Sequence, residues 1–328
     1  MPAEFQITTW HWAAFIGAVL LFLSLDLGVF HRKAHVVKFG EALAWTAIWF
    51  LLAMVFAFAF VAQKMGQQKS ILFITGYITE LSLSMDNVFV IALIFAYFRV
   101  PTAYQHRVLF WGILGALIMR GVMIGAGVAL INRFQWTLYI FAVFLIYTGV
   151  KMIFSREEGV EPEKNPLIRL ARKFYPVSSE FHGQKFMVLL NGARTLTPLA
   201  VALLMVETID LVFALDSIPA IFGFTTDPFI VFTSNVFAIL GLRSLYFVLA
   251  NAIGYFRFLK VGLSVVLVFI GIKMLLAPHG AKKFWFQLDI EPKISLAIVA
   301  SIIFVSILTS VVVAWQEKRD KTTTNGHK

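Results

Sequence analysis

Nine apolar stretches run through this sequence, and each is long enough to cross a membrane as a helix. A helix needs about 20 predominantly apolar residues to span a hydrocarbon core of roughly 30 Å. Because lipid offers no hydrogen-bond partners, backbone groups there are satisfied within the helix itself. The expected spans are Trp10–Phe30, Glu41–Ala62, Ile71–Phe98, Val108–Ile131, Phe134–Phe154, Pro198–Gly223, Phe229–Asn251, Phe258–Ala277 and Ile294–Trp315. We therefore expect an all-α polytopic membrane protein with about nine transmembrane helices.

The composition agrees with this class and excludes others. Of 328 residues, 59% are hydrophobic and only 14% are charged, whereas soluble domains carry about 25% charged residues. Cysteine is absent, which excludes disulfides, thiolate metal sites and thiol catalysis. No serine–histidine or Gly-x-Ser-x-Gly arrangement stands in the spans, so an enzyme is not expected. No resident cofactor is expected either.

Lysine and arginine are unevenly distributed between the connections. With the N-terminus outside, the segments on the cytoplasmic side hold 17 lysines and arginines, and those on the other side hold six. Cytoplasmic loops carry the excess of basic residues, so the count predicts an N-out, C-in orientation. The same distribution accounts for the net charge of +10 without a nucleic-acid partner.

The spans divide the chain into five parts. Residues 1–70 hold two N-terminal helices, 71–154 a first three-helix unit, and 198–277 a second three-helix unit. Residues 155–197 form a cytoplasmic loop that is expected to be a solvated linker, with a regulatory or docking role as the alternative. Its semi-apolar part, 180–197, is expected at the membrane interface. Residues 278–328 hold the last helix and a polar tail, 316–328, that is expected to be disordered.

The two three-helix units resemble each other. Glu80-Leu-Ser-Leu-Ser-Met-Asp86-Asn87 in the first matches Asp210-Leu-Val-Phe-Ala-Leu-Asp216-Ser217 in the second, with two acids six residues apart in each. Further on, Ile118-Met-Arg120 matches Gly241-Leu-Arg243, and Gly149-Val-Lys151 matches Gly271-Ile-Lys273. Because each unit has an odd number of helices, the first helices of the two units cross the membrane in opposite directions. Two inverted three-helix repeats are therefore expected, which is typical of transporters with a midplane site.

Charged residues inside the spans are the candidate site. Each costs about 2.5–3.5 kcal/mol at a helix centre, so they are expected to be paired, protonated or bound to a cation. Two arginines neutralise two of six acids, and four formal negative charges remain. The acids are Asp26, Glu80, Asp86, Glu207, Asp210 and Asp216, and the expected counter-ions are Arg120 and Arg243. Asp26 belongs to a looser echo of the motif, Ser24-Leu-Asp26.

The spacing of these residues favours a hard metal ion. Glu80, Ser84 and Asn87 are spaced i, i+4, i+7 and share one helix face. In the second unit Asp210 and Ser217 share a face. Carboxylate, amide and hydroxyl oxygens suit Mn²⁺, Ca²⁺ or Mg²⁺. All seven histidines lie at helix ends, in loops or in the tail, which argues against a typical zinc site. The alternative for Asp86 and Asp216 is a structural ion pair with the two arginines.

The acidic motifs resemble those of a known family. Glu80-Leu-Ser-Leu-Ser-Met-Asp86-Asn87-Val-Phe-Val and Phe213-Ala-Leu-Asp216-Ser217-Ile-Pro219 are similar to the two signature stretches of the TerC family. Ser234-Asn235-Val-Phe-Ala-Ile-Leu-Gly-Leu-Arg243 also looks like a family segment. The likeness extends over roughly residues 10–277, and the Alx branch of the family is the most similar.

This resemblance implies a nine-helix protein of the bacterial cytoplasmic membrane that takes part in metal-ion homeostasis, with manganese export as the favoured activity. The implied site positions are Glu80, Asp86, Asn87, Asp210, Asp216 and Ser217. The expected partners are the lipid bilayer, a divalent cation as substrate and protons as a candidate coupling ion, with a homo-oligomer left open. The alternative function is a non-transporting membrane component of a tellurium-resistance or stress-response complex.

Overall fold

The computed structural model describes residues 6–25, 38–154, 165–190, 192–250, 258–277, 288 and 290–325. Within these residues, eight helical segments are long and apolar enough to cross a membrane. They are α2 (Phe39–Val55) with its continuation through the π-helix η2 (Phe56–Val61) and α3 (Ala62–Met65), α4 (Gln67–Tyr97), α5 (Thr102–Arg133), α6 (Thr137–Phe154), α8 (Pro198–Phe222), α9 (Pro228–Ala250), α10 (Leu259–Leu276) and α11 (Pro292–Asn325). The chain is thus a nearly all-helical, multi-pass membrane protein.

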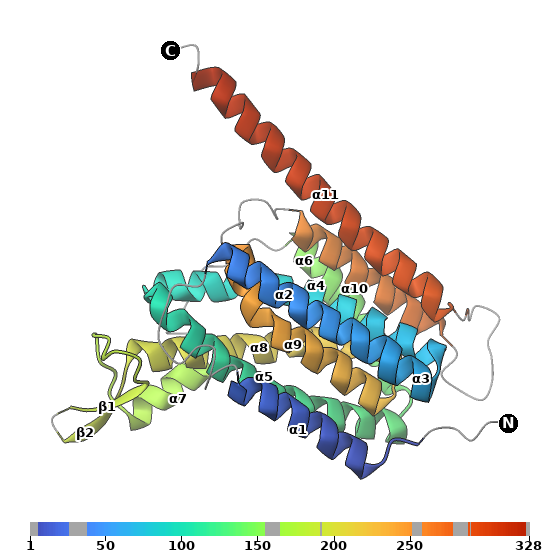
Figure 1. Cartoon of the computed structure of the whole chain (residues 1–328), viewed down its shortest axis with the longest axis horizontal. Coiled ribbons are helices and arrows are strands. Elements are labelled where there is room, and N and C mark those ends of the chain that lie inside the picture. The colour runs from blue at the N-terminus through green and yellow to red at the C-terminus, as the bar shows by residue number, and fades with distance from the viewer. Residues whose placement is uncertain are drawn as a thin grey trace.

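The first expected span corresponds to α1 (Thr9–Leu25), which is apolar but shorter than the other spans. The expected end of that span, after Leu25, falls outside the described residues. The expectation of a disordered tail is wrong for residues 316–325, because α11 continues as a helix to Asn325 and projects beyond the bundle (Figure 1).

The helices lie side by side in one bundle (Figure 1). α9 is at its centre, since 89% of its apolar window is buried and it packs against α2, α4 and α5. It carries Thr233, Ser234 and Asn235, which are fully buried. Polar side chains are therefore held in the middle of the molecule, next to the acidic helices α4 and α8.

Counterpart helices of the two units pack in a symmetrical way. α4 packs on α9 and α8 on α5, while α6 packs on α10 and α4 on α8. This pattern is unchanged when α4, α5 and α6 are exchanged for α8, α9 and α10. The inverted repeat itself stays a prediction, and this packing is what a two-fold relation between the units would produce.

Two matched glycines give the α6–α10 contact its closeness. A Cβ on Gly149 would lie 2.8 Å from the carbonyl oxygen of Ser264, and one on Gly271 would lie 2.7 Å from that of Ala142. The two contacts are equivalent, because Ser264 lies seven residues before Gly271 and Ala142 lies seven residues before Gly149. Small residues permit this approach of helix backbones, which is how packing stabilises helix pairs in lipid.

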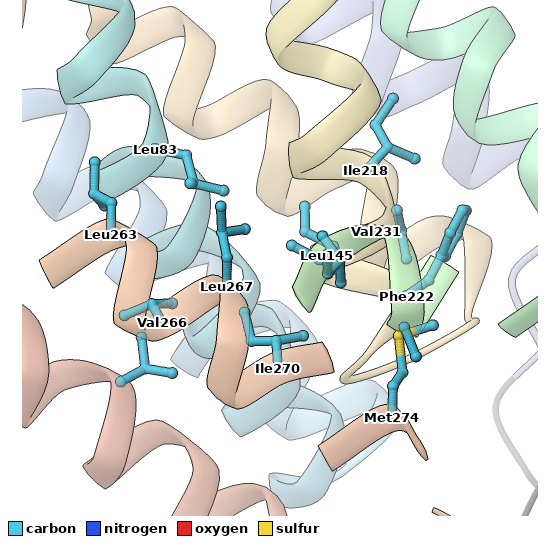
Figure 2. Close-up of a cluster of buried hydrophobic side chains, with 14 of the residues drawn as sticks. Leu83, Leu145, Ile218, Phe222, Val231, Leu263, Val266, Leu267, Ile270 and Met274 are labelled. Carbon is cyan, nitrogen blue, oxygen red and sulfur yellow. The ribbon is translucent and has the colours of Figure 1, made fainter. Parts of the chain in front are cut away.

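The largest hydrophobic cluster lies on the side of the bundle formed by α10. Figure 2 shows Leu263, Leu267, Ile270 and Met274 of α10 facing residues of the neighbouring helices. Its partners are Leu83 of α4, Leu145 of α6, Ile218 and Phe222 of α8, and Val231 of α9. This cluster contains residues of both three-helix units and packs them together.

The segment 155–197 departs from the expected linker. It contains the helix α7 (Pro166–Phe174) and a two-stranded antiparallel hairpin, β1 (Met187–Leu190) and β2 (Ala193–Leu196). The class is therefore not strictly all-α. Asn165 caps α7 by accepting hydrogen bonds from the backbone N–H groups of Leu167 and Ile168, at 2.9 and 3.1 Å. Figure 1 places this region at one end of the bundle, opposite the end where α1 begins.

Candidate functional site

Two helices carry the acidic motifs, and each has a reason for its position. α4 bears Glu80 and Asp86, and α8 bears Asp210 and Asp216. α8 begins where predicted, because the Thr197 side chain accepts a hydrogen bond from the N–H of Ala200 and Pro198 occupies the first turn. α4 and α8 pack against each other, so the two motifs face a common interior.

Arg120 of α5 joins the two motifs. It is 2% exposed, and its guanidinium forms an ion pair with Glu80 and a two-pronged one with Asp210. Nη2 lies 3.0 Å from Asp210 Oδ1, and Nε lies 3.3 Å from Asp210 Oδ2. Nη1 also donates to Ser217 Oγ at 3.3 Å and to Asn235 Oδ1 at 3.2 Å. The guanidinium of Arg120 therefore binds side chains of three helices, α4, α8 and α9.

The arrangement divides the expected site. Arg120 lies with Glu80 and Asp210, the first acid of each motif. The second acids, Asp86 and Asp216, line a separate cavity of about 340 Å³. We call it the acidic cavity; its polar lining is Asp86 and Asn87 of α4, Asp216 and Ser217 of α8, Thr148 and Lys151 of α6, and Lys260 of α10. Both motifs thus contribute an acid and a neutral oxygen ligand to it.

Two lysines change the expected charge balance. Asp216 is in hydrogen-bond contact with Thr148 and in electrostatic contact with Lys151, and Lys260 lines the same cavity. Two carboxylates and two ammonium groups therefore face one space. From the sequence, only Arg120 and Arg243 were expected as counter-ions. The surplus of acid inside the bundle is smaller than expected for this reason.

One face of α4 buries oxygen atoms that have no hydrogen-bond partner among the described residues. They are Glu80 Oε2, Ser84 Oγ and Asn87 Oδ1, in side chains that are 0%, 0% and 3% exposed. Their spacing of i, i+4, i+7 is the face predicted from the sequence. Buried polar groups are normally paired, because leaving one without a partner costs about 1–3 kcal/mol. This row runs from the Arg120 ion pairs to the wall of the acidic cavity.

The other expected residues lie around these two centres. Glu207 is partly buried and in electrostatic contact with Asp210, and its carboxylate packs over Gly115 of α5. Arg243 is 7% exposed and lines a small void with Asn87 and Asp210. Its expected counter-ion role stays a prediction. Asp26 lies outside the described residues. In the described part of the chain, no three histidine, aspartate or glutamate side chains converge as a metal-binding group.

Besides Lys151, three residues at these centres were not predicted as part of the site. Asn235 bonds Arg120, Thr148 bonds Asp216, and Lys260 lines the acidic cavity. Asn235 offered a signal, since it is an amide in the middle of an apolar span and polar groups there usually have a function. Thr148 and Lys260 offered no such signal. Threonine hydroxyls in helices commonly donate to a carbonyl of their own helix, and lysines are common at the ends of membrane-spanning helices.

Comparison with known proteins settles the family. The sequence profile of the family described as integral membrane protein TerC family matches residues 65–320. The chain belongs to the TerC family. It is 54% identical over 301 residues to an uncharacterized membrane protein, STKORF319, of Myxococcus xanthus, a match that covers 92% of each chain.

Two further relatives carry a name. The protein called "Putative membrane-bound redox modulator Alx" is 43% identical over 319 residues in Salmonella typhi, covering 94% of this chain and 96% of that one. Its Escherichia coli K12 counterpart is 42% identical over 316 residues, covering 94% and 95%. The expected likeness to Alx is confirmed. No solved structure matches this chain.

Proposed function

We propose that this TerC-family protein exports divalent metal cations, Mn²⁺ foremost, from the bacterial cytoplasm through the acidic cavity. The observation that carries the proposal is that Asp86 and Asp216, from two different acidic helices, line one cavity with Asn87 and Ser217. Carboxylate, amide and hydroxyl oxygens form the ligand set that hard divalent cations prefer. No resident cofactor and no enzymatic step belong to this proposal.

The unpartnered oxygens of α4 support a passage for a cation or its water ligands. Glu80 Oε2, Ser84 Oγ and Asn87 Oδ1 are acceptors in a buried row that begins at the cavity wall. An ion that loses water on entering needs such oxygens in exchange. The row would lead it from the cavity toward the level of Arg120.

The lysines give the cavity a means of exchange. The positive charges of Lys151 and Lys260 balance the negative charges of Asp86 and Asp216 in the cavity. A divalent cation carries the same charge as the two ammonium groups together, so it can replace them without changing the net charge of the cavity. Electrostatic repulsion between the ion and the ammonium groups would then push the lysine side chains outward. Selectivity for Mn²⁺ over Ca²⁺ and Mg²⁺ is part of the proposal and rests on the family resemblance.

Export against the membrane potential requires coupling. An inside-negative potential of 100 mV opposes the exit of one charge by about 2.3 kcal/mol, and of a divalent ion by about twice that. No G-x-x-x-x-G-K-[ST] motif for ATP stands in the sequence. We propose protons as the counter-flowing ion and alternating access between the two three-helix units as the motion, with the N-terminus outside the inner membrane.

Metal flux in sealed vesicles containing the purified protein tests the proposal. Asp86→Asn and Asp216→Asn should each abolish Mn²⁺ transport while membrane abundance stays at or above that of the wild type, because each removes a charge from the membrane interior. Glu180→Gln removes an exposed carboxylate outside the bundle and is the matched control. Full transport by both aspartate variants would refute the metal path.

The alternative is a non-transporting component of a tellurium-resistance or stress-response complex. The relatives' name, redox modulator, fits an indirect effect of metal content on redox state. Direct thiol–disulfide exchange by this chain is excluded, because it has no cysteine. Wild-type vesicles that move no Mn²⁺, Ca²⁺ or Mg²⁺ under any proton gradient would favour this alternative.

A further inference from the structure

The helix α7 has a surface that the proposed transport does not use. Leu167, Leu170 and Phe174 are 39%, 54% and 69% exposed. Their spacing of i, i+3, i+7 places them on one face. Ile168, on another side, is 1% exposed and packs into the protein. The helix is thus held by one side and shows a second, large apolar face outward.

A third side of α7 is basic. Arg169, Arg172 and Lys173 are all exposed, and at 100° per residue they fall on the side turned away from the apolar face. An apolar face with a basic face opposite is typical of helices that lie at a membrane surface and contact anionic lipid. Nine residues alone bind a membrane weakly, so the fixing of α7 to the bundle matters.

The start of α7 is held against α8, one of the helices long and apolar enough to span a membrane. The Asn165 Nδ2–H group lies 3.2 Å from Met205 Sδ, and Thr208 Oγ1 donates to Asn165 Oδ1 at 3.5 Å. Thr208 is ten residues into α8, which is about 15 Å from the start of that helix at 1.5 Å per residue. The apolar face of α7 therefore begins alongside the first half of a candidate membrane-spanning helix, well inside its ends.

The hairpin that follows α7 has the same character. Leu189 is 71% exposed and Met187 is 40% exposed, on alternate positions of β1 that share one side of the strand. Leu189 pairs across the hairpin with Arg194, which is exposed. Backbone hydrogen bonds between Leu196 and the residues just after α7 tie the hairpin to this helix.

We propose that α7 is a lipid-binding element, with its apolar face in the acyl-chain region of the adjacent leaflet and its basic face on anionic headgroups. The long stems of arginine and lysine allow their charges to reach the headgroups while the apolar face of the same helix contacts acyl chains. Each basic residue near an anionic surface adds to the attraction. Because Asn165 contacts Thr208, lipid bound to α7 would also hold in place the part of α8 that carries Glu207 and Asp210.

The absence of cysteine makes the test direct. A single cysteine at Leu170→Cys or Phe174→Cys can carry a nitroxide spin label, with Arg172→Cys as the matched control on the basic side. The full-length protein is placed in lipid nanodiscs, and each label's relaxation by oxygen and by a water-soluble nickel chelate is compared. Oxygen collects in the acyl region and the chelate in water. Labels at 170 and 174 should respond several-fold more to oxygen than to nickel, and the label at 172 should show the reverse.

The lipid composition tests the charge part of the proposal. Replacing phosphatidylcholine by phosphatidylglycerol should bury the label at 174 more deeply. Neutralising Arg169, Arg172 and Lys173 together to Gln should remove that difference. A label at 170 as accessible to nickel as the one at 172 would overturn the proposal. Exclusion of both reagents with spin–spin broadening between protomers would overturn it in favour of a second copy. None of these results depends on metal transport, so they are separable from the proposed function.

Discussion

Replacing Arg120 by methionine should be among the most damaging single changes in the bundle. The substitution keeps a long flexible side chain but leaves Glu80 and Asp210 without the cation that pairs with both. Glu80 is 0% exposed and Asp210 is 9% exposed, so water cannot replace the lost partner. Breaking a buried ion pair by removing one side costs about 3–5 kcal/mol. We expect Arg120→Met to lower the free energy of unfolding by about that amount.

Asp210→Asn provides the internal comparison. It removes the negative charge and one of the two oxygen acceptors, while the amide oxygen can still accept from Arg120. The loss is that of about one charge-assisted hydrogen bond, about 1.5–3 kcal/mol. The pair of Arg120 and Glu80 remains and is neutral, so the loss should be smaller than for Arg120→Met. The double variant should lose less than the sum of the two single losses, with a coupling of about 0.5–3 kcal/mol.

The measurement is unfolding of the purified protein in mixed detergent micelles, followed by circular dichroism. Lys69→Met is the control for a peripheral pair, since Lys69 is 39% exposed and binds Asp227 at 2.6 Å. Such a pair contributes about 0–1 kcal/mol. If Arg120→Met unfolded like Lys69→Met, or if Asp210→Asn proved the more damaging change, the buried cluster would not have the role assigned to it.

The remaining predictions use three glycines in which the same added methyl group meets different neighbours. Gly125→Ala has nothing within 4 Å of the new Cβ, so it should raise the free energy of unfolding by about 0.5–1 kcal/mol through helix propensity. Gly115→Ala meets the carboxylate end of Glu207, which can swing aside, and should be nearly neutral in the same micelle assay. Gly271→Ala meets a backbone carbonyl oxygen at 2.7 Å and should cost about 1–3 kcal/mol. If Gly271→Ala were as stable as Gly125→Ala, the close α6–α10 packing would be contradicted.

Much of the fold could be predicted because the bilayer imposes strong rules on the sequence. Long apolar stretches predicted the membrane-spanning helices, and the start of α8 followed from Thr197 and Pro198. The hairpin and α7 were missed because their apolar residues are few and mixed with charge. Asn165 and Pro166 mark its start, but a helix of nine residues also needs the contact with α8, which is not visible in local sequence.

The division of the acids into two centres could not be predicted from spacing. Glu80 and Asp86 are six residues apart, and periodicity alone does not say which neighbouring helix each one faces. That choice depends on where α5 and α6 pack, since α5 brings Arg120 and α6 brings Thr148 and Lys151. The shared face of Glu80, Ser84 and Asn87 was predictable, because it follows from helix geometry within one element.

The two centres differ in how readily their counter-ions can move. Arg120 bonds three helices from a site that is 2% exposed, so its charge cannot leave without breaking several buried interactions. Lys151 is exposed and enters the acidic cavity from its rim, on a flexible stem. A cation that competes for carboxylate oxygens would displace the lysine first, because its side chain can move into water while Arg120 cannot. Any relative movement of α4 and α8, by contrast, must change the geometry around Arg120, which binds an acid of each. Under the proposed function, the cavity would select and load the ion, while the arginine would set which arrangement of the two units is stable.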